Sequence, residues 1–555
     1  MAEIPVGEYL FRRLKQIGIE TAFGVPGDYE LALLNHVEPA GVRWIGTPNE
    51  LVGAYAADGY ARLKGAAALV TTFGPGELSA LCGIGGSFCE MVPVLHIVGY
   101  PSFAAQSSGR ILHHTLGDKS YDHYVRISSE LSCATTILKN PENAIAEIDR
   151  VLNAMMFHSQ PGYIGITEDV VKTMVPVSSL NSAPIKMTLS AGAEDDHALA
   201  AIMATLESSR NPIVIVDGGA GRGSWAPHAN DLIKALRSLH FNTIMGKGVV
   251  EEDEPLFAGC YAGVGSLPQT SKAVEDSDCI LWLGHMPSDF NTGMFTDQVK
   301  SSTIIDFQRF QITVGNKQFQ ARMTSVLPKL TEAIKTSSIL AKRSLPEPVA
   351  PLFDQALDIP SSIITQDYLW PRLSSFVKPG DMVIAETGTS QVGAVATKIP
   401  KGAYYWTQAV WGSIGYAIGG AIGAAIAGKE LGRYKRVIVL TGEGSLQLTA
   451  QAISILNRHG VVPYLYTVER YFEGWDAIYN DVPDWDYGGL FKSFSPEVPT
   501  TTFKIQTAAE LDRILSDDGF QNATSPQCID MVLDKYDAPG GLKAIFDHKK
   551  KAARA

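Results

Sequence analysis

Apolar runs typical of buried strands alternate with amphipathic segments from the start of the chain. Apolar residues spaced between Tyr9 and Ile17 as on one face of a helix predict a first helix. A short apolar run at 21–25 follows and ends in the turn residues 26–28, and strand-like runs return at 66–72 and 92–98. Alternating strands and helices predict a parallel sheet covered by helices on both faces.

The same alternation returns twice further along the chain. The middle segment has strand-like runs at 212–217, 279–284 and 302–306, and the last segment has them at 382–386, 436–441 and 461–468. Linker signals lie at 176–186, which contains serine, asparagine and proline, and at 343–360, which contains four prolines. A chain of 555 residues is too long for one core. We therefore predict an α/β fold of three consecutive doubly wound parallel-sheet domains, at 1–182, 190–342 and 361–555.

One uncharged run, 411–428, raises the question of a membrane span. More than half of it is glycine and alanine, a composition that favours close helix packing over contact with lipid. The net charge of −12 opposes binding to nucleic acid or to an anionic membrane, since both reward a basic face. We predict neither kind of partner, and the basic C-terminal cluster at Lys549, Lys550, Lys551 and Arg554 is interpreted as a solvated tail.

The cysteines and the N-terminus bear on the compartment. Six cysteines show neither zinc-ligand spacing nor the density of a disulfide framework. The first residues, 1–18, carry five charges and do not fit a signal peptide. Both features predict a reducing, cytoplasmic location.

A strand, a glycine-rich turn and a helix follow one another in the last segment. The run 436–441 leads into Gly442-Glu443-Gly444-Ser445 and then into an amphipathic helix predicted at 446–458. Amide groups at the start of such a helix face an anion, so this arrangement is typical of phosphate binding. The turn alone is a weak signal, because many such turns bind no phosphate.

Several short stretches follow one another in a set order along the chain. They are GVPGDY at 24–29, NEL at 49–51, AYAADGYAR at 54–62, TTFGPGELSA at 71–80, LHHTLG at 112–117, SDFNTG at 288–293, ETGTS at 386–390, WGSIG at 411–415 and GEGSLQLT at 442–449. Together these stretches resemble the pyruvate decarboxylases, which are thiamine-diphosphate-dependent 2-keto-acid decarboxylases. The resemblance implies pyrimidine-binding, central and diphosphate-binding α/β domains, and a homodimer or homotetramer whose active sites lie between chains.

The resemblance assigns two residues to the activation of the cofactor. Glu50 stands where the family has a glutamate that hydrogen-bonds the aminopyrimidine ring and makes the ring's own amino group a base. Without the surrounding motif, Glu50 would be interpreted as a surface helix carboxylate. Ile414 matches the large aliphatic residue that holds the cofactor bent, and we expect it to be buried whether it serves the cofactor or the core.

Further positions would contact the cofactor. Gly412 and Ser413 would present backbone groups to the aminopyrimidine ring, and Thr389, Gly444 and Ser445 would lie along the cofactor and its diphosphate.

Asp28, His113 and His114 match the family's polar cluster around the substrate carboxylate. Protonatable groups are needed there, because the intermediate left after carbon dioxide departs must be protonated. Adjacent histidines point in different directions, so one of the two is expected to orient the other or to contact the backbone. The intact pair favours decarboxylases over acetolactate synthases and oxidases with the same cofactor.

The metal motif departs from the family pattern. The family begins this motif with Gly-Asp-Gly and ends it with Asn-Asn, whereas this chain has Glu443 at the aspartate position and Glu469 near the asparagine position. Carboxylate oxygens suit Mg²⁺, so we predict a magnesium site with Glu443 and either Glu469 or Glu473 as ligands. A weakened cofactor site is the alternative.

The substrate pocket departs as well. Ile478 stands where the family has a glutamate that helps decarboxylation and product release, and Asp476 is the nearest acid. Phe290 and Trp411 match aromatic residues of the family's pocket, while Gln391 replaces a small alanine. These changes leave three hypotheses open. The chain is a decarboxylase that releases an aldehyde from pyruvate or a larger or aromatic 2-keto acid, a carboligase that forms acyloins from a 2-keto acid and an acceptor aldehyde, or a catalytically inactive relative that still binds the cofactor.

Overall fold

The computed structural model describes residues 2–182, 185–186, 190–219, 225–349, 363–461, 463–468, 482–534 and 536–552. Its contacts divide the chain into two compact units. The first unit comprises Met1–Thr188, Ile418–Arg433 and Thr449–His459, and the second comprises Leu189–Ala417, Tyr434–Leu448 and Gly460–Ala555. The second unit holds two large sheets, so the described residues form three large sheets in this α/β fold.

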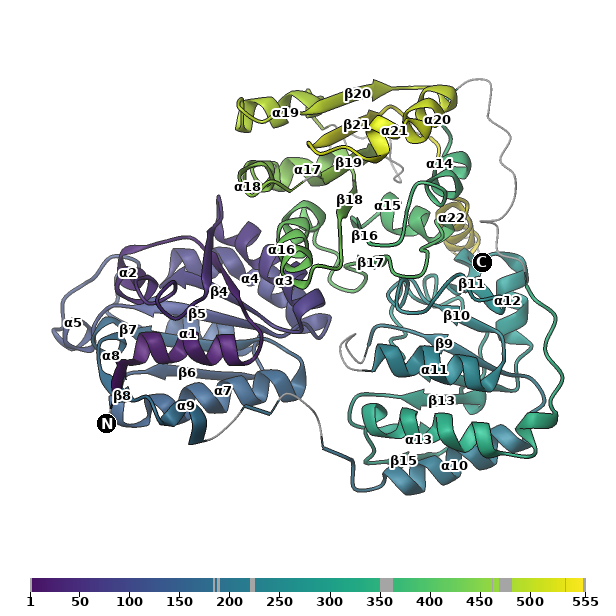
Figure 1. Cartoon of the computed structure of the whole chain (residues 1–555), viewed down its shortest axis with the longest axis horizontal. Helices are drawn as coiled ribbons and strands as arrows, with labels where there is room; N and C mark the ends of the chain where they lie inside the picture. Colours follow the sequence, from purple (N-terminus) through teal and green to yellow (C-terminus); the bar gives the residue numbers. More distant parts are fainter. Residues whose placement is uncertain are drawn as a thin grey trace. The chain divides into compact units, whose positions relative to one another are not determined.

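The first unit is built on a fully parallel sheet of strand order β3-β2-β4-β5-β7-β6 (Figure 1). The strand runs predicted in this segment are confirmed, with ends that differ by one or two residues. The strands are β2 (Thr21–Gly24), β3 (Arg43–Gly46), β4 (Ala67–Thr72), β5 (Val94–Tyr100), β6 (Ala134–Leu138) and β7 (Gly162–Thr167), and a separate antiparallel pair joins β1 (Glu3–Pro5) to β8 (Met174–Pro176). The helices are α1 (Val6–Gln16), α2 (Leu31–Leu34), α3 (Glu50–Lys64), α4 (Pro75–Cys89), α5 (Phe103–Ser107), α6 (His123–Ser129), α7 (Ala144–His158), α8 (Glu168–Val171) and α9 (Ser179–Ser182).

A buried ion pair joins α1 to α7 inside this unit. Arg13 has no exposed surface, and its Nε and Nη2 donate to the two carboxylate oxygens of Asp149 at 2.9 and 2.6 Å. The Tyr9 hydroxyl also donates to Asp149. Because removing one partner of a buried pair leaves an uncompensated charge, Asp149 contributes strongly to the stability of this unit.

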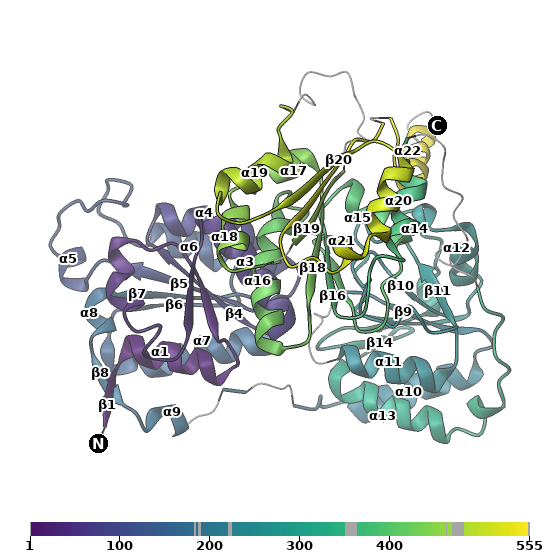
Figure 2. The ribbon, with the colours of Figure 1, turned by 45° about the horizontal axis from the view of Figure 1, so that its top comes forward.

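The glycine- and alanine-rich run predicted to pack closely forms α16 (Tyr416–Leu431). Its part from Ile418 onward lies against α3 in the first unit (Figure 2). A Cβ on Gly423 would come within 1.7 Å of the Ala56 carbonyl oxygen, and one on Gly59 within 2.0 Å of the Gly420 carbonyl oxygen. The small residues therefore let the backbones of the two helices come into contact. No helix among the described residues has the length and apolar character needed to cross a membrane.

The first sheet of the second unit has the order β11-β10-β9-β12-β13-β14-β15. It is parallel from β11 to β13, and β14 and β15 add an antiparallel hairpin at one edge that the sequence analysis did not predict. Figure 2 shows α10, α11 and α13 together along one side of it, where their buried residues share a core with the strands. The elements are α10 (Asp195–Ser208), β9 (Pro212–Val216), α11 (Ala226–Leu236), β10 (His240–Asn242), β11 (Phe257–Cys260), α12 (Pro268–Glu275), β12 (Cys279–Leu283), β13 (Ile304–Phe307), β14 (Ile312–Val314), β15 (Lys317–Phe319) and α13 (Met323–Thr336).

The second sheet of this unit is fully parallel, with the order β17-β16-β18-β19-β21-β20. Its strands are β16 (Asp381–Ala385), β17 (Tyr404–Thr407), β18 (Arg436–Thr441), β19 (Pro463–Val468), β20 (Thr501–Ile505) and β21 (Gln527–Met531). Its helices are α14 (Gln366–Leu373), α15 (Thr389–Gly393), α17 (Glu443–Thr449), α19 (Tyr487–Phe494), α20 (Ala508–Ser516), α21 (Asp518–Gln521) and α22 (Gly540–Ala552).

The single helix predicted at 446–458 is wrong. The chain forms α17 and then α18 (Ala452–Arg458), with a break at Ala450 and Gln451. Backbone hydrogen bonds from Ile453 to Ala450 and from Ser454 to Gln451 span three residues, so the chain turns tightly there.

None of the six cysteines forms a disulfide, as predicted.

Candidate functional site

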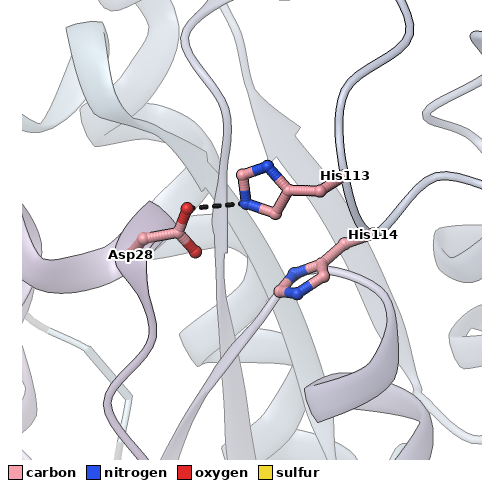
Figure 3. Close-up of side chains that lie close together, drawn as sticks. All are labelled: Asp28, His113 and His114. Carbon is pink, nitrogen blue, oxygen red and sulfur yellow. Dashed lines mark hydrogen bonds and ion pairs between the residues drawn. The ribbon is translucent and has the colours of Figure 1, made fainter.

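Three predicted catalytic side chains converge in the first unit. Asp28 begins the short 3₁₀ helix η1 (Asp28–Glu30) shortly after β2, and His113 and His114 lie in the loop that follows α5. An oxygen or nitrogen of each lies within 4.8 Å of those of the other two. His113 Nε2 hydrogen-bonds the Asp28 carboxylate at 2.6 Å, and the two side chains are 57% and 53% exposed (Figure 3). The structure therefore presents an open acid–base cluster.

The two histidines take different roles in the geometry. The His113 ring stacks on Tyr29, whose hydroxyl lies 3.2 Å from His113 Nδ1. The His114 ring stands edge-on to the His113 ring, with centroids 4.7 Å apart. His114 has a left-handed backbone with φ 69°, and its carbonyl oxygen accepts a hydrogen bond from Tyr124 at 2.8 Å. Neighbouring tyrosines thus fix both residues in place.

Glu50 is the first residue of α3. The side chain of the preceding Asn49 caps the helix by accepting a hydrogen bond from the Val52 amide. In the described part of the chain, the Glu50 carboxylate itself has no hydrogen-bond or ion-pair partner. It is half-buried and available to a ligand group.

Two buried carboxyl groups lie next to these residues. Burial raises the pKa of Glu30, the last residue of η1, to about 7, and it raises the pKa of Glu77 in α4 to about 7 as well. Glu30 has no exposed surface, and hydrogen bonding from the Thr72 side chain and from nearby backbone only partly offsets the effect of burial on its pKa. The turn that carries Asp28 is therefore backed by a carboxyl group that resists ionisation.

We expect Glu30→Gln to stabilise the chain more at pH 8 than at pH 5. A carboxyl group whose pKa is raised on folding costs nothing below its unfolded value of 4.5, where both states are protonated. The unfolded state releases its proton first as pH rises, so the cost grows up to about pH 7 and reaches about 3 kcal/mol above it. Thermal unfolding at both pH values measures the difference, and an equal shift at both would contradict the prediction.

The loop 411–415, which is predicted to contact the cofactor, lies in the second unit and is held by two polar side chains. Glu386, which follows β16, is buried and accepts hydrogen bonds from the amides of Gly415 and Ala417, each at 3.1 Å. The Gln408 side chain accepts from the Ser413 amide at 2.9 Å. Burial raises the pKa of Glu386 to about 7. These contacts fix the loop at both ends.

Ile414 lies between those fixed points and is 46% exposed. The expectation that it would be buried is wrong, because its side chain projects from the loop and not into a core. The neighbouring Trp411 is 40% exposed. Large apolar side chains on a rigid loop are suited to contact a bound molecule.

The other predicted pocket residues have varied settings. Gln391 in α15 is fully buried, and its amide nitrogen lies 3.5 Å from the Gln408 carbonyl oxygen. Phe290 is half-buried in a loop that Asn291 ties to the buried Asp217 at 2.9 Å. The Gln391 amide therefore faces the backbone of Gln408 inside the fold.

The residues predicted to follow the diphosphate lie at two helix starts. Thr389 begins α15, and Glu443 begins α17 directly after β18 and Gly442, with Gly444 and Ser445 next in line. Glu443 is largely buried. Glu469, Glu473, Asp476 and Ile478 lie outside the described residues.

This part of the chain fits thiamine diphosphate in two respects. A Cβ on Gly388, just before Thr389, would meet nothing within 4 Å, so the turn has open space beside its backbone. Gly412 has a φ of 62°, which favours glycine and turns the loop backbone before Ser413.

Glu386 and Gln408 were not assigned functional roles from the sequence. Their importance rests on hydrogen bonds to residues far along the chain. The sequence offered one signal for Glu386. An apolar run typical of a buried strand ends at this residue, and a buried carboxylate without a nearby cation is unusual.

Comparisons with known proteins agree with this arrangement. Residues 4–123 match the thiamine pyrophosphate enzyme N-terminal TPP binding domain, residues 199–333 match the central domain, and residues 386–469 match the C-terminal TPP binding domain. The chain is 39% identical to pyruvate decarboxylase isozyme 1 of Saccharomyces cerevisiae, over 98% of each chain. It is 38% identical to the pyruvate decarboxylase of Candida glabrata, over 98% of this chain and 97% of the relative. It is 36% identical to that of Aspergillus terreus, over 97% and 96%.

Proposed function

The chain belongs to the thiamine pyrophosphate enzymes of the pyruvate decarboxylase type, and we propose that it converts a 2-keto acid to an aldehyde and carbon dioxide without oxidation. The observation that carries the proposal is the convergence of Asp28, His113 and His114 in a chain whose three segments match the domains of that family. Pyruvate or a larger or aromatic analogue is the proposed substrate.

Glu50 and Ile414 are proposed to prepare the cofactor. When bound, thiamine diphosphate supplies an acidic carbon that can add to the keto group and accept the electrons left by carbon dioxide. The Glu50 carboxylate would hydrogen-bond the aminopyrimidine ring, and Ile414 would support the cofactor from the loop that Glu386 and Gln408 hold.

Asp28, His113 and His114 are proposed to hold the substrate carboxylate and to deliver a proton after carbon dioxide leaves. The Asp28–His113 hydrogen bond keeps a proton on His113 Nε2, while the Tyr29 hydroxyl donates to Nδ1. A proton held at a defined atom in an exposed cluster is what general acid catalysis requires.

Three finer points are part of the same proposal. Mg²⁺ would bind the diphosphate with help from Glu443, the one predicted metal ligand within the described residues. The chain would work as a homodimer or homotetramer with active sites between chains. Six cysteines without a disulfide among them support a reducing, cytoplasmic setting.

Carboligation is the second candidate function. The sequence places Ile478 where the family has a glutamate that assists product release. A slower final protonation would leave time for the activated intermediate to attack an acceptor aldehyde, which would give an acyloin.

Product analysis separates these functions. The protein is incubated with thiamine diphosphate, Mg²⁺ and a panel of 2-keto acids, with and without an acceptor aldehyde. Free aldehyde as the main product supports the decarboxylase, and acyloin as the main product even without added acceptor supports the carboligase. No turnover and no bound cofactor would contradict both.

Ile414→Ala should lower kcat without destabilising the fold. Its side chain is 46% exposed, so truncation removes little core packing, and the unfolding midpoint should stay within about 1 °C. A displaced cofactor would lower kcat by up to about 100-fold. Leu448→Ala, which truncates another exposed aliphatic side chain of this unit, is the matched control. Equal kcat values for wild type and Ile414→Ala would refute the supporting role.

A further inference from the structure

A tight turn, Gly74-Pro75-Gly76, touches two of the proposed catalytic groups. A Cβ on Gly76 would lie 3.2 Å from Glu50 Oε1, so the Glu50 carboxylate rests close to the turn. A Cβ on Gly74 would lie 2.5 Å from the His114 carbonyl oxygen, and Gly74 has a φ of 79°. The backbone of the turn therefore lies close to both the Glu50 carboxylate and the His114 carbonyl group, and neither group has much room to move toward the turn.

The carboxylate of Glu77 fixes this turn. Glu77 Oε1 accepts a hydrogen bond from the Gly74 amide at 2.9 Å, and Glu77 Oε2 accepts one from the Tyr163 hydroxyl at 2.8 Å. The Tyr163 hydroxyl lies 2.9 Å from that of Tyr100, so Tyr163, which donates to Glu77, accepts from Tyr100. All three side chains are buried, on α4, β7 and β5. Glu77 therefore ties the turn to the centre of the sheet.

The surroundings favour a specific role over general packing. Among the described residues, the titratable groups that interact with the Glu77 carboxyl group are the tyrosines Tyr100, Tyr124 and Tyr163, and no ion pair joins Glu77 to a cation there. A buried carboxyl group without a cation is costly, and an apolar side chain of the same size would avoid that cost. Its place beside the turn is consistent with a need for an acceptor at the Gly74 amide.

We propose that Glu77 is a positioning residue, whose carboxylate fixes the turn that sets the places of Glu50 and His114 for the reaction. Glu77 itself touches neither substrate nor cofactor. The inference rests on the proposed function, because it concerns the geometry of groups assigned there.

Two substitutions separate the hydrogen bond from the packing. Glu77→Met keeps the length of the side chain and removes the acceptor, whereas Glu77→Gln keeps an oxygen that can accept from the Gly74 amide. Asp149→Asn is the control. It weakens the buried ion pair with Arg13 in the same unit, and the hydrogen bonds described for Asp149 involve no residue of the turn.

Two measurements are made on each full-length variant. Hydrogen exchange of a peptide that covers the turn is followed without cofactor, and kcat/KM for a 2-keto acid is measured at 25 °C with thiamine diphosphate and Mg²⁺. In Glu77→Met we expect exchange about tenfold faster, because the acceptor of the Gly74 amide hydrogen bond is lost. We expect its kcat/KM to fall about 100-fold, as for a catalytic group displaced by about 1 Å.

The other variants should behave differently. Glu77→Gln should restore both values to within about threefold of wild type, because the amide oxygen replaces the lost acceptor. Asp149→Asn should lower the unfolding midpoint and leave kcat/KM unchanged. If Glu77→Met fails to fold, Tyr163→Phe decides, with an expected loss of about tenfold in kcat/KM because one donor to Glu77 is gone.

The proposal is overturned if folded Glu77→Met, or Tyr163→Phe in its place, is as active as wild type. It is also overturned if Glu77→Gln is as impaired as Glu77→Met, since charge or packing would then matter more than the acceptor. A wild-type chain that converts no 2-keto acid would refute the proposed function first and this inference with it.

Discussion

Glu50→Gln should lower kcat/KM for the 2-keto acid by about 10²- to 10⁴-fold while the protein stays folded. The side chain keeps its size and its place at the start of α3, but the amide cannot act as a charged acceptor for the cofactor ring. In the described part of the chain the carboxylate has no hydrogen-bond or ion-pair partner, so its loss breaks no such internal bond. Removing a negative charge from a helix start costs only about 0.3–1 kcal/mol.

Glu147→Gln is the matched control for this substitution. Glu147 also lies in the first turn of a helix of the same unit, where it pairs with the exposed Arg150 at 2.7 Å. Its substitution should leave kcat/KM unchanged and should cost at most about 1 kcal/mol of stability. Activities are measured with saturating thiamine diphosphate and Mg²⁺, and circular dichroism checks the fold. Full activity in Glu50→Gln would refute the proposed cofactor activation.

Continuous apolar runs predicted the strands well. The run 436–441 forms β18 with the same bounds, and the run 66–72 forms β4 with one residue fewer. Both strands lie inside parallel sheets, and after Arg436 at the start of β18 every side chain along them is apolar or is a small threonine. Strand ends shift by a residue or two, because hydrogen bonding to the neighbouring strand sets them.

The break between α17 and α18 shows where local pattern fails. The residues at the break, Ala450 and Gln451, are good helix formers, and nothing in their neighbourhood signals a turn. The β14–β15 hairpin escaped prediction for a related reason, since its strands are only three residues long. Short elements of this kind are decided by tertiary contacts.

Site geometry was predictable only in part. The resemblance assigned Asp28, His113 and His114 to one polar cluster but predicted no particular pairing, and in the structure His113 Nε2 lies 2.6 Å from the Asp28 carboxylate. The roles of Glu386 and Glu77 were not predicted, because each acts through backbone amides that are brought near by folding. Ile414 was misjudged because an aliphatic residue is usually buried, whereas a loop held at both ends can expose one.

Asp28→Asn should lower kcat by about 10²- to 10⁴-fold with little change in stability. The Asp28 carboxylate can only accept, so it holds the proton on His113 Nε2 and leaves Nδ1 to accept from Tyr29. An asparagine amide can donate or accept, so the preference between the two His113 tautomers is lost. Both side chains are more than half exposed, so the free energy of unfolding should change by no more than about 0.5 kcal/mol.

Asp118→Asn is the matched control for this substitution. Asp118 and His123 form another exposed carboxylate–imidazole pair of the same unit, at 2.5 Å, and neither residue belongs to the proposed site. If the Asp28 effect came from disturbing a surface ion pair, Asp118→Asn would lower kcat equally. We expect kcat of Asp118→Asn to equal that of wild type, because only the Asp28–His113 pair would present its proton to the substrate. Comparable losses in both variants, or full activity in Asp28→Asn, would contradict the proposed role of Asp28 and His113 in the reaction.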